Sequence, residues 1–189
     1  MLTYKNPKAK SCVVCERVFV PERMGQVVCR GSCGLKKARA EREAAEKAER
    51  ESIKRRKEAL KRVPDLIKEA QTAFNAWVRA RDAEQPCISC DAPPPDMSTL
   101  HAGRDAGHYR STGSASHLRF HPDNCHAQCV KCNQWGAGMA VDYRIRLLQR
   151  IGPARVEALE NDNTLHKWQR DELIAIKATY KAKLKEMKK

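Results

Sequence analysis

Residues 123–133 read DNCHAQCVKCN, and their Cys-x-x-Cys pair, Cys129 and Cys132, decides how this chain is expected to fold. A second Cys-x-x-Cys pair, Cys87 and Cys90, lies upstream, across the segment 91–128. Zinc prefers four tetrahedral ligands, and a Cys-x-x-Cys turn presents two thiolates from one tight backbone turn. The two pairs therefore predict a structural zinc site that joins both ends of this segment.

Four more cysteines near the N-terminus form a second candidate zinc quartet with the spacing C-x2-C-x13-C-x3-C: Cys12, Cys15, Cys29 and Cys33. In a reducing cytoplasm, cysteines at such spacings are metal ligands more often than disulfides. Both zinc sites would stabilise units too small to bury a sufficient apolar core. The ninth cysteine, Cys125, is expected to be a small buried hydrophobic residue.

The charge of the chain points to a polyanionic partner. Lysine and arginine total 37 against 23 acidic residues, which gives a net charge of +14. A protein this basic gains affinity for nucleic acid because each neutralised phosphate releases condensed counterions, although charge can also serve solubility alone. The chain has neither a secretory h-region nor an apolar run long enough to span a membrane, so we expect no membrane partner.

The sequence divides into three expected parts: an N-terminal zinc knuckle at 1–34, a charged helix at 35–62, and a domain at 63–189. Residues 35–62 contain no Pro or Gly and carry Glu and Arg or Lys at i,i+4 spacing, as in Glu46 and Arg50. This helix has almost no apolar stripe, so it is either a solvated linker or a basic arm that contacts DNA.

The third part is expected to be a small α+β domain with flanking helices. Residues 64–84 form the first predicted helix, and 140–152 and 170–189 form two more. The apolar face of the first predicted helix should be core: Leu66, Ile67, Ala70, Phe74, Trp77 and Val78.

The stretch DAGHYRSTG, residues 105–113, places Asp105 and His108 between the two cysteine pairs of the third part. Hydrolysis of a phosphodiester needs an activated water, and a neutral histidine can accept its proton. A divalent ion such as Mg²⁺ or Mn²⁺ stabilises the leaving oxygen, and carboxylate or amide oxygens suit that ion. Asp105 is therefore a candidate metal ligand and His108 a candidate base.

A loop whose ends are held by a zinc site and that carries these residue types resembles the HNH, or ββα-metal, nucleases. In that resemblance Asn124 takes the middle position and orients the imidazole, while Asn133, directly after Cys132, takes the third position and joins Asp105 as a metal ligand. His126 is a reserve ligand. HNH sequences commonly carry an acidic or histidine ligand just before the base, where this chain has Gly107.

The run HYRSTGSASHLRF, residues 108–120, is expected to form a hairpin with Ser and Gly at its tip. Arg110 and Arg119 are then candidate phosphate contacts. Solvated charge is an equally good explanation of these two arginines.

Four motifs in order, PCISC, DAGHYRSTG, LRFHPDNCHAQCVKCNQ and YRIRLLQRIG, resemble the NinG (Rap) recombination proteins of lambdoid phages. The resemblance takes in nearly the whole chain. It implies an HNH-like endonuclease in the host bacterial cytoplasm that cuts branched recombination intermediates, such as Holliday junctions and D-loops. Symmetric cutting of a junction needs two active sites, so we also expect a homodimer. The resemblance further implies recombination proteins of phage or host as partners.

Two other functions would use the same cysteines and charge. A zinc-ribbon DNA-binding protein without catalysis would have no need of His108, Asn124 and Asn133 in HNH order. An HNH nuclease of relaxed specificity would cut linear and branched duplexes equally.

Overall fold

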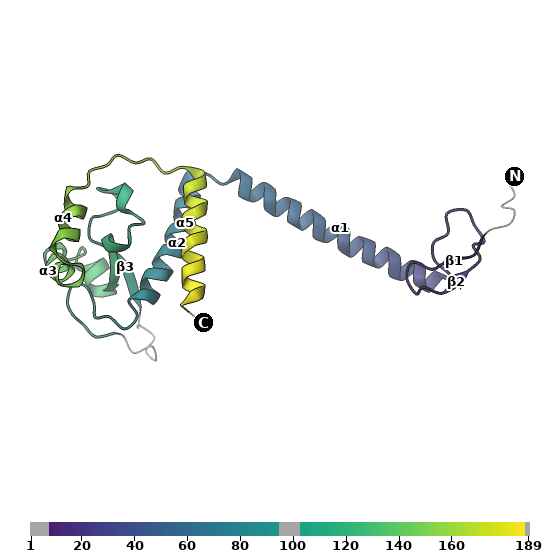
Figure 1. Cartoon of the computed structure of the whole chain (residues 1–189), viewed down its shortest axis with the longest axis horizontal. Helices are drawn as coiled ribbons and strands as arrows, with labels where there is room; N and C mark the ends of the chain where they lie inside the picture. The colour runs from purple at the N-terminus through teal and green to yellow at the C-terminus, as the bar shows by residue number, and fades with distance from the viewer. Residues whose placement is uncertain (1–7, 95–102, 188–189) are drawn as a thin grey trace. The chain divides into compact units, whose positions relative to one another are not determined.

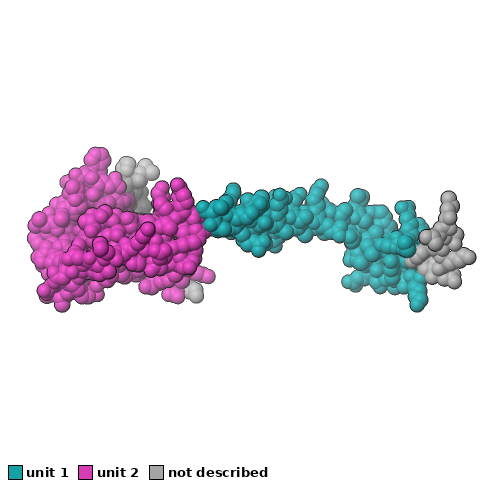
Figure 2. Space-filling view, turned by 90° about the horizontal axis from the view of Figure 1, so that it is seen from above, with its two compact units in different colours: residues 1–60 teal, residues 61–189 magenta. Residues whose placement is uncertain are grey.

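The computed structural model describes residues 8–94 and 103–187 and divides the chain into two compact units, residues 1–60 and 61–189 (Figure 2). The fold is a mixture of helices and two small sheets, so the expected α+β class is confirmed. Within the described residues, each helix is too short or too polar to cross a membrane.

The first unit has two short strands and one long helix. Strands β1 (Lys10–Ser11) and β2 (Val18–Phe19) pair antiparallel, and helix α1 spans Gly31–Leu60 (Figure 1). The predicted helix began at residue 35, four residues too late. The helix begins earlier because the Arg30 carbonyl accepts bonds from the N–H groups of Cys33 and Gly34, each 3.1 Å long, which places Cys33 in the first turn.

Helix α1 presents charge to solvent along most of its length, and Cys33 is its buried residue. Ion pairs at i,i+4 spacing run along it, including Arg39–Glu43 at 2.9 Å and the expected Glu46–Arg50 at 4.0 Å. Exposed pairs of this kind each stabilise a helix by about 0.3–0.5 kcal/mol.

In the second unit, helix α2 (Val63–Arg81) packs against helix α5 (Arg170–Glu186). Pro64 in the first turn and Asp65 at its N-terminus suit a helix start. The predicted apolar face of α2 is confirmed as core. Phe74 is fully buried and meets Tyr180 edge to face, with ring centroids 4.7 Å apart.

A two-stranded antiparallel hairpin positions the predicted site residues. Strand β3 (Arg104–His108) pairs with β4 (Cys125–Cys129), so that Asp105 lies opposite Gln128 and His108 opposite Cys125. Side chains alternate between the faces of a strand. His108 and Cys125 therefore share the face next to α2, whereas Asp105, His126 and Gln128 share the other face.

The predicted hairpin across 108–120 is wrong, because His108 ends β3 and residues 109–120 lie in the connection between β3 and β4. That connection carries two 3-10 turns, η1 (Ser116–Leu118) and η2 (Pro122–Asn124). Its Ser- and Gly-rich stretch lacks the alternating apolar residues that would hold a second strand against the core.

Three helical elements lie between β4 and α5: a π-helical turn η3 (Lys131–Trp135), α3 (Ala140–Ile151) and α4 (Pro153–Asn161). Helix α4 was not predicted. Gly152 has φ 85°, a conformation that glycine adopts freely, and Pro153 starts the new helix directly after this bend. Tyr143, Leu147, Val156 and Leu159 from α3 and α4 form a second core with Ile88.

Candidate functional site

The four cysteines of the second unit form one cluster. The Sγ atoms of Cys87, Cys90, Cys129 and Cys132 all lie within 4.8 Å of one another, and those of Cys90 and Cys129 are 3.8 Å apart. Zn–S bonds of about 2.3 Å in a tetrahedron place the sulfurs about 3.8 Å apart. These cysteines can hold a structural zinc ion.

The N-terminal cysteines form a matching cluster, also with Sγ atoms within 4.8 Å: Cys12, Cys15, Cys29 and Cys33. Two of its Sγ pairs are 3.5 Å (Cys15–Cys29) and 3.8 Å (Cys29–Cys33) apart. The helical start of α1 brings Cys33 close to Cys29. A second zinc ion therefore fits here, and the wider C-x3-C spacing suits a ligand on the first turn of a helix.

Backbone N–H groups favour the thiolate form of one cysteine in each cluster, whereas burial and the neighbouring thiols raise the pKa of Cys29 to about 12 and also raise the pKa of Cys132. Burial alone would raise the pKa of Cys87, but N–H donors, first that of Cys129 at 3.3 Å, lower it to about 7. In the same way, the N–H of Cys29 at 3.4 Å contributes to lowering the pKa of Cys12 to about 6 against the effect of burial. Zinc binds thiolates, so these donors prepare Cys12 and Cys87 as ligands of a metal ion.

His108 closes strand β3 and is half-buried. Its Nε2 lies 2.9 Å from the Arg119 carbonyl, which can only accept, so Nε2 carries the hydrogen and Nδ1 holds the lone pair. Nδ1 faces the Cys125 sulfur at 3.8 Å. Burial lowers the pKa of His108 below its usual range. The imidazole is therefore neutral at pH 7, as a general base must be.

Asp105 and Asn133, predicted together as metal ligands, lie in contact. The Asn133 amide nitrogen donates to Asp105 Oδ2 at 2.8 Å, and the Gln134 amide nitrogen donates to the same oxygen at 2.8 Å. Oδ1 of Asp105 accepts no hydrogen bond from the described residues. Asn133 also keeps its own Oδ1 for another partner, so two oxygens remain that could contact a divalent ion.

Gly107 occupies the position where HNH sequences commonly carry the first ligand. The structure explains why no larger residue stands there. A Cβ atom built on Gly107 would lie 2.0 Å from Gln128 Oε1. Gln128 in turn donates to Ser89 Oγ at 2.7 Å and to the Gly138 carbonyl at 2.8 Å. Asp105, two residues earlier, points to the same face as position 107 and is the acidic residue nearest to it along that face of β3.

Asn124 does not bond to the imidazole of His108, contrary to our expectation. Its Oδ1 accepts from the Arg110 N–H at 2.8 Å, and its Nδ2 donates to the carbonyls of Arg110 and Leu118 at 3.0 and 3.2 Å. All the hydrogen-bonding groups of this buried amide are thus engaged in holding the loop. The Arg119 carbonyl orients the imidazole instead.

Arg110 and Arg119 are both half-buried and engaged with the protein. The Arg110 guanidinium donates to the Leu159 and Asp162 carbonyls and to Asn163 Oδ1 at 3.0 Å, which satisfies acceptors at the end of α4. Arg119 donates to Gln71 Oε1 at 3.3 Å and to the Thr112 carbonyl at 3.4 Å. Both side chains stabilise loops in the structure, and their role as phosphate contacts stays a prediction.

His126 is buried on the hairpin face opposite to His108, next to two residues that the sequence did not single out. Its Nδ1 lies 3.0 Å from Arg81 Nη2 and 3.4 Å from Asp82 Oδ2. Asp82 also accepts the Ala127 N–H at 2.9 Å, and these contacts, led by Arg81, outweigh burial and hold its pKa far below the usual range. The available signal in the sequence was the adjacent pair Arg81 and Asp82, which lies just before Cys87.

The fold and the two cysteine clusters define a small α+β protein organised around two candidate zinc sites. Residues 4–189 match the profile of the family described as Bacteriophage Lambda NinG protein. The chain belongs to this phage NinG family.

Relatives of similar length support this assignment. The chain is 42% identical to Protein ninG of Salmonella phage P22 over 92% of this chain and 90% of the relative. It is 41% identical to Protein ninG of Escherichia phage lambda, with the same coverage, and 40% identical to that of Escherichia phage 933W over 96% of this chain and 95% of the relative. No solved structure matches the chain.

Proposed function

We propose that this protein is a metal-dependent, HNH-type DNA endonuclease that cuts branched recombination intermediates, such as Holliday junctions and D-loops, in phage recombination. The observation that carries the proposal is the contact between Asp105 and Asn133, two residues far apart in sequence that HNH order pairs as metal ligands. The neutral His108 near the end of the same strand and the net charge of +14 support it.

The proposed mechanism assigns one task to each residue. Nε2 of His108 is engaged with the Arg119 carbonyl and Nδ1 faces Cys125 Sγ at 3.8 Å, so the ring would have to turn for Nδ1 to accept a proton from water. Asp105 and Asn133 would hold Mg²⁺ or Mn²⁺ through their remaining oxygens, and that ion would stabilise charge on the scissile phosphate. Asn124 acts indirectly, because it holds the loop that carries Arg119.

The branched substrate and the homodimer come from the family resemblance. A four-way junction has two strands to cut, so a symmetric cut requires two copies of the site. The host bacterial cytoplasm, where phage DNA recombines, is the proposed place of action, with recombination proteins of phage or host as partners.

The test is cleavage of an end-labelled four-way junction beside a linear duplex of matched arms. Wild type, His108→Ala and His166→Ala are compared, each with its zinc content measured. The divalent ion is omitted or added back as Mg²⁺ or Mn²⁺, because a strong chelator would also remove zinc. His166 is the matched control: it is half-buried on the connection between α4 and α5, beside Trp168.

We expect cutting that needs the divalent ion, is confined to the junction, and falls roughly 10²–10⁴-fold in His108→Ala but not in His166→Ala. Equal cutting of both substrates would indicate an HNH nuclease without branch specificity. Binding without any cutting would contradict the proposal and indicate a zinc-stabilised DNA-binding protein.

A further inference from the structure

The turn that follows β4 carries a tryptophan whose side chain lies almost entirely in solvent. Trp135 is 82% exposed, whereas the other two tryptophans, Trp77 and Trp168, are half-buried and pack against the core of the second unit. An indole ring is a large apolar group that is highly buried on average. The exposure of Trp135 therefore needs an explanation other than the stability of the fold.

Trp135 is the last residue of η3, the turn that also carries part of the candidate metal site. Asn133 and Gln134, directly before it, both donate to Asp105 Oδ2 at 2.8 Å. Cys132, one residue earlier, is buried in the cysteine cluster of the second unit. These contacts fix the backbone of η3, which presents the indole one residue beyond the side chains that bond to Asp105.

The chain turns sharply after Trp135, and part of that turn is strained. Ala137 and Met139 have φ of 49° and 46°, in the left-handed region that residues other than glycine rarely adopt. A Cβ atom on Gly136 would lie 3.0 Å from the Cys132 carbonyl oxygen. Strained backbone and short π-helical turns both occur frequently at functional sites, and this segment combines the two features.

A cationic side chain lies on the same face of η3 as the indole. Lys131 is exposed and precedes Trp135 by four residues, a spacing that places two side chains on one face of a helical turn. Phosphates pair with an ammonium group and bases stack on an aromatic ring. The two side chains together therefore suit a nucleic acid.

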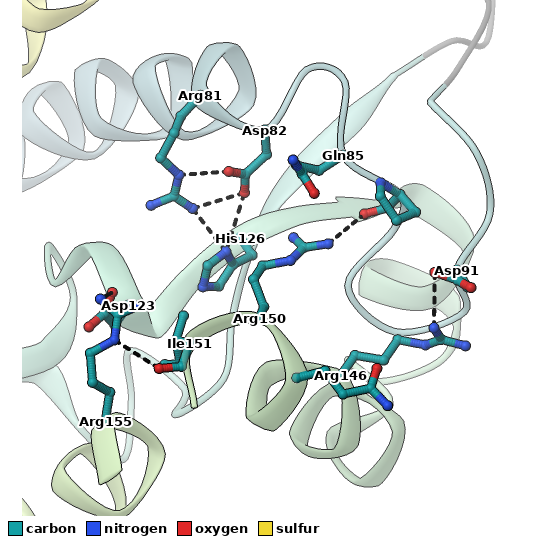
Figure 3. Close-up of a pocket in the computed structure, with 12 residues that line it drawn as sticks. Arg81, Asp82, Gln85, Asp91, Asp123, His126, Arg146, Arg150, Ile151 and Arg155 are labelled. Atoms are coloured by element: carbon teal, nitrogen blue, oxygen red, sulfur yellow. Dashed lines mark hydrogen bonds and ion pairs between the residues drawn. The ribbon is translucent and has the colours of Figure 1, made fainter. Parts of the chain in front are cut away.

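A cavity of about 630 Å³ between the end of α2, strand β4 and helices α3 and α4 differs from this surface (Figure 3). His126 and Arg150 are among the side chains that line it, and Arg150 donates to the Pro86 carbonyl at 3.1 Å. The other three arginines of this cavity pair with its aspartates: Arg81–Asp82 at 2.6 Å, Arg146–Asp91 at 2.9 Å and Arg155–Asp123 at 3.3 Å. The arginines of the cavity are thus engaged within the protein, whereas Trp135 and Lys131 face solvent.

We propose that Trp135 stacks on a DNA base at the branch point of the substrate, with Lys131 beside a neighbouring phosphate. Inside a continuous duplex every base is stacked on both faces, so the indole could reach a base only after costly unstacking. Bases that flank a branch point open at lower cost, because the exchange of strands interrupts the stack there. Because a branch point belongs to the proposed substrate, this assignment rests on the proposed function and names what the site would recognise.

The test measures binding, so it can succeed or fail independently of cutting. The affinity of the full-length, zinc-loaded protein is measured without a divalent ion, for a four-way junction and for a linear duplex of matched arms. Wild type is compared with Trp135→Ala, Trp135→Phe and Leu165→Ala, and zinc content is measured in each. Leu165 is 99% exposed on the connection between α4 and α5, so it controls for the loss of an exposed apolar side chain.

We expect Trp135→Ala to bind the junction about 5–150-fold more weakly than wild type, the usual effect of removing one stacked aromatic ring. Its affinity for the linear duplex should stay close to that of wild type. Trp135→Phe should keep most of the affinity for the junction, because a phenyl ring also stacks on a base. Leu165→Ala should bind both substrates as wild type does.

Tryptophan emission gives a second readout that a purely structural role of Trp135 would not change. Stacking on a base quenches the emission of an indole, so the junction should quench wild type more strongly than Trp135→Phe. Trp77 and Trp168 are present in both proteins and provide the common background.

Equal junction affinity in wild type and zinc-loaded Trp135→Ala, or an equal loss for junction and duplex, would overturn the proposal. A smaller sedimentation coefficient of Trp135→Ala without DNA would also overturn it, because the indole would then belong to an interface between two copies of the chain. If the protein never cuts DNA but loses junction binding only in Trp135→Ala, this assignment is supported and only the endonuclease proposal fails.

Discussion

Gly107 is a residue at which the fold leaves no room for a side chain. A Cβ atom there would meet Gln128 Oε1 at 2.0 Å and Gln128 Cβ at 3.0 Å. Gly107→Ala should therefore destabilise the second unit by about 1–3 kcal/mol, the usual cost of overpacking a buried site. Urea unfolding would measure this loss.

Gly103→Ala is the control for that measurement, because its Cβ would make an ordinary contact with Val130 at 3.8 Å. If both variants unfold at the wild-type midpoint, the Gln128 side chain does not constrain position 107.

The histidine at the end of β3 makes stability depend on pH in a definite direction. Burial lowers the folded-state pKa of His108 below the unfolded value of about 6.5. The unfolded chain therefore binds the proton first as the solution is acidified. The contribution of neutral His108 is fully present above about pH 6.5 and is lost as pH falls through the lower folded value.

His108→Gln removes this titration while keeping an amide that can donate to the Arg119 carbonyl. The free energy of unfolding should therefore fall less between pH 7.5 and 5.5 in His108→Gln than in wild type, as measured by urea unfolding with zinc content checked at both values. Parallel losses in the two proteins would show that His108 titrates as it does in the unfolded chain.

At the scale of elements, α5 depends on α2 through a cluster of aromatic rings. Phe74 meets Tyr180 at 4.7 Å and Phe120 at 5.9 Å between centroids. Phe74→Ala should lower the free energy of unfolding of this unit by about 3–5 kcal/mol, through lost burial and the cavity left behind. Denaturant unfolding followed by circular dichroism measures this change.

Trp135→Ala is the matched control for the aromatic cluster, because Trp135 is 82% exposed. Its midpoint should stay near that of wild type. A similar loss in both variants would mean that α2 and α5 do not hold the core.

At the scale of the whole molecule, each unit is expected to carry its own zinc ion. Wild type should contain two zinc ions per chain, and Cys33→Ser and Cys132→Ser should each contain one, as counted by elemental analysis. Cys132→Ser should also lower the thermal stability of the second unit, because that cluster joins the segment before the hairpin to the end of β4.

Cys125→Ala tests whether the count depends on cluster membership. Cys125 is buried but lies outside both clusters, so this variant should retain two zinc ions. Loss of both ions from a single cluster variant would show that the two sites are not independent.

Much of the local structure could be predicted, because its causes are local. Helix-forming residues without Pro or Gly produce α1, and apolar residues at helical spacing produce the buried face of α2. Prediction failed where the packing of one element against another decides the local structure. The loop 109–124 lacks strand pairing partners, and α4 depends on packing of Val156 and Leu159 against α3.

The candidate site also has some features that could be predicted from the sequence and others that depend on packing. Both cysteine clusters and the contact between Asp105 and Asn133 could be predicted from the sequence, because the chemistry of the expected ligands restricts the residue types and their spacing. Three other features depend on how distant segments pack: Arg110 satisfies carbonyls at the end of α4, Asn124 holds a loop, and His126 and Arg150 line one cavity. The physical reason is that buried donors and acceptors take whichever partner the packed chain brings within reach, and that partner is set by contacts between distant segments.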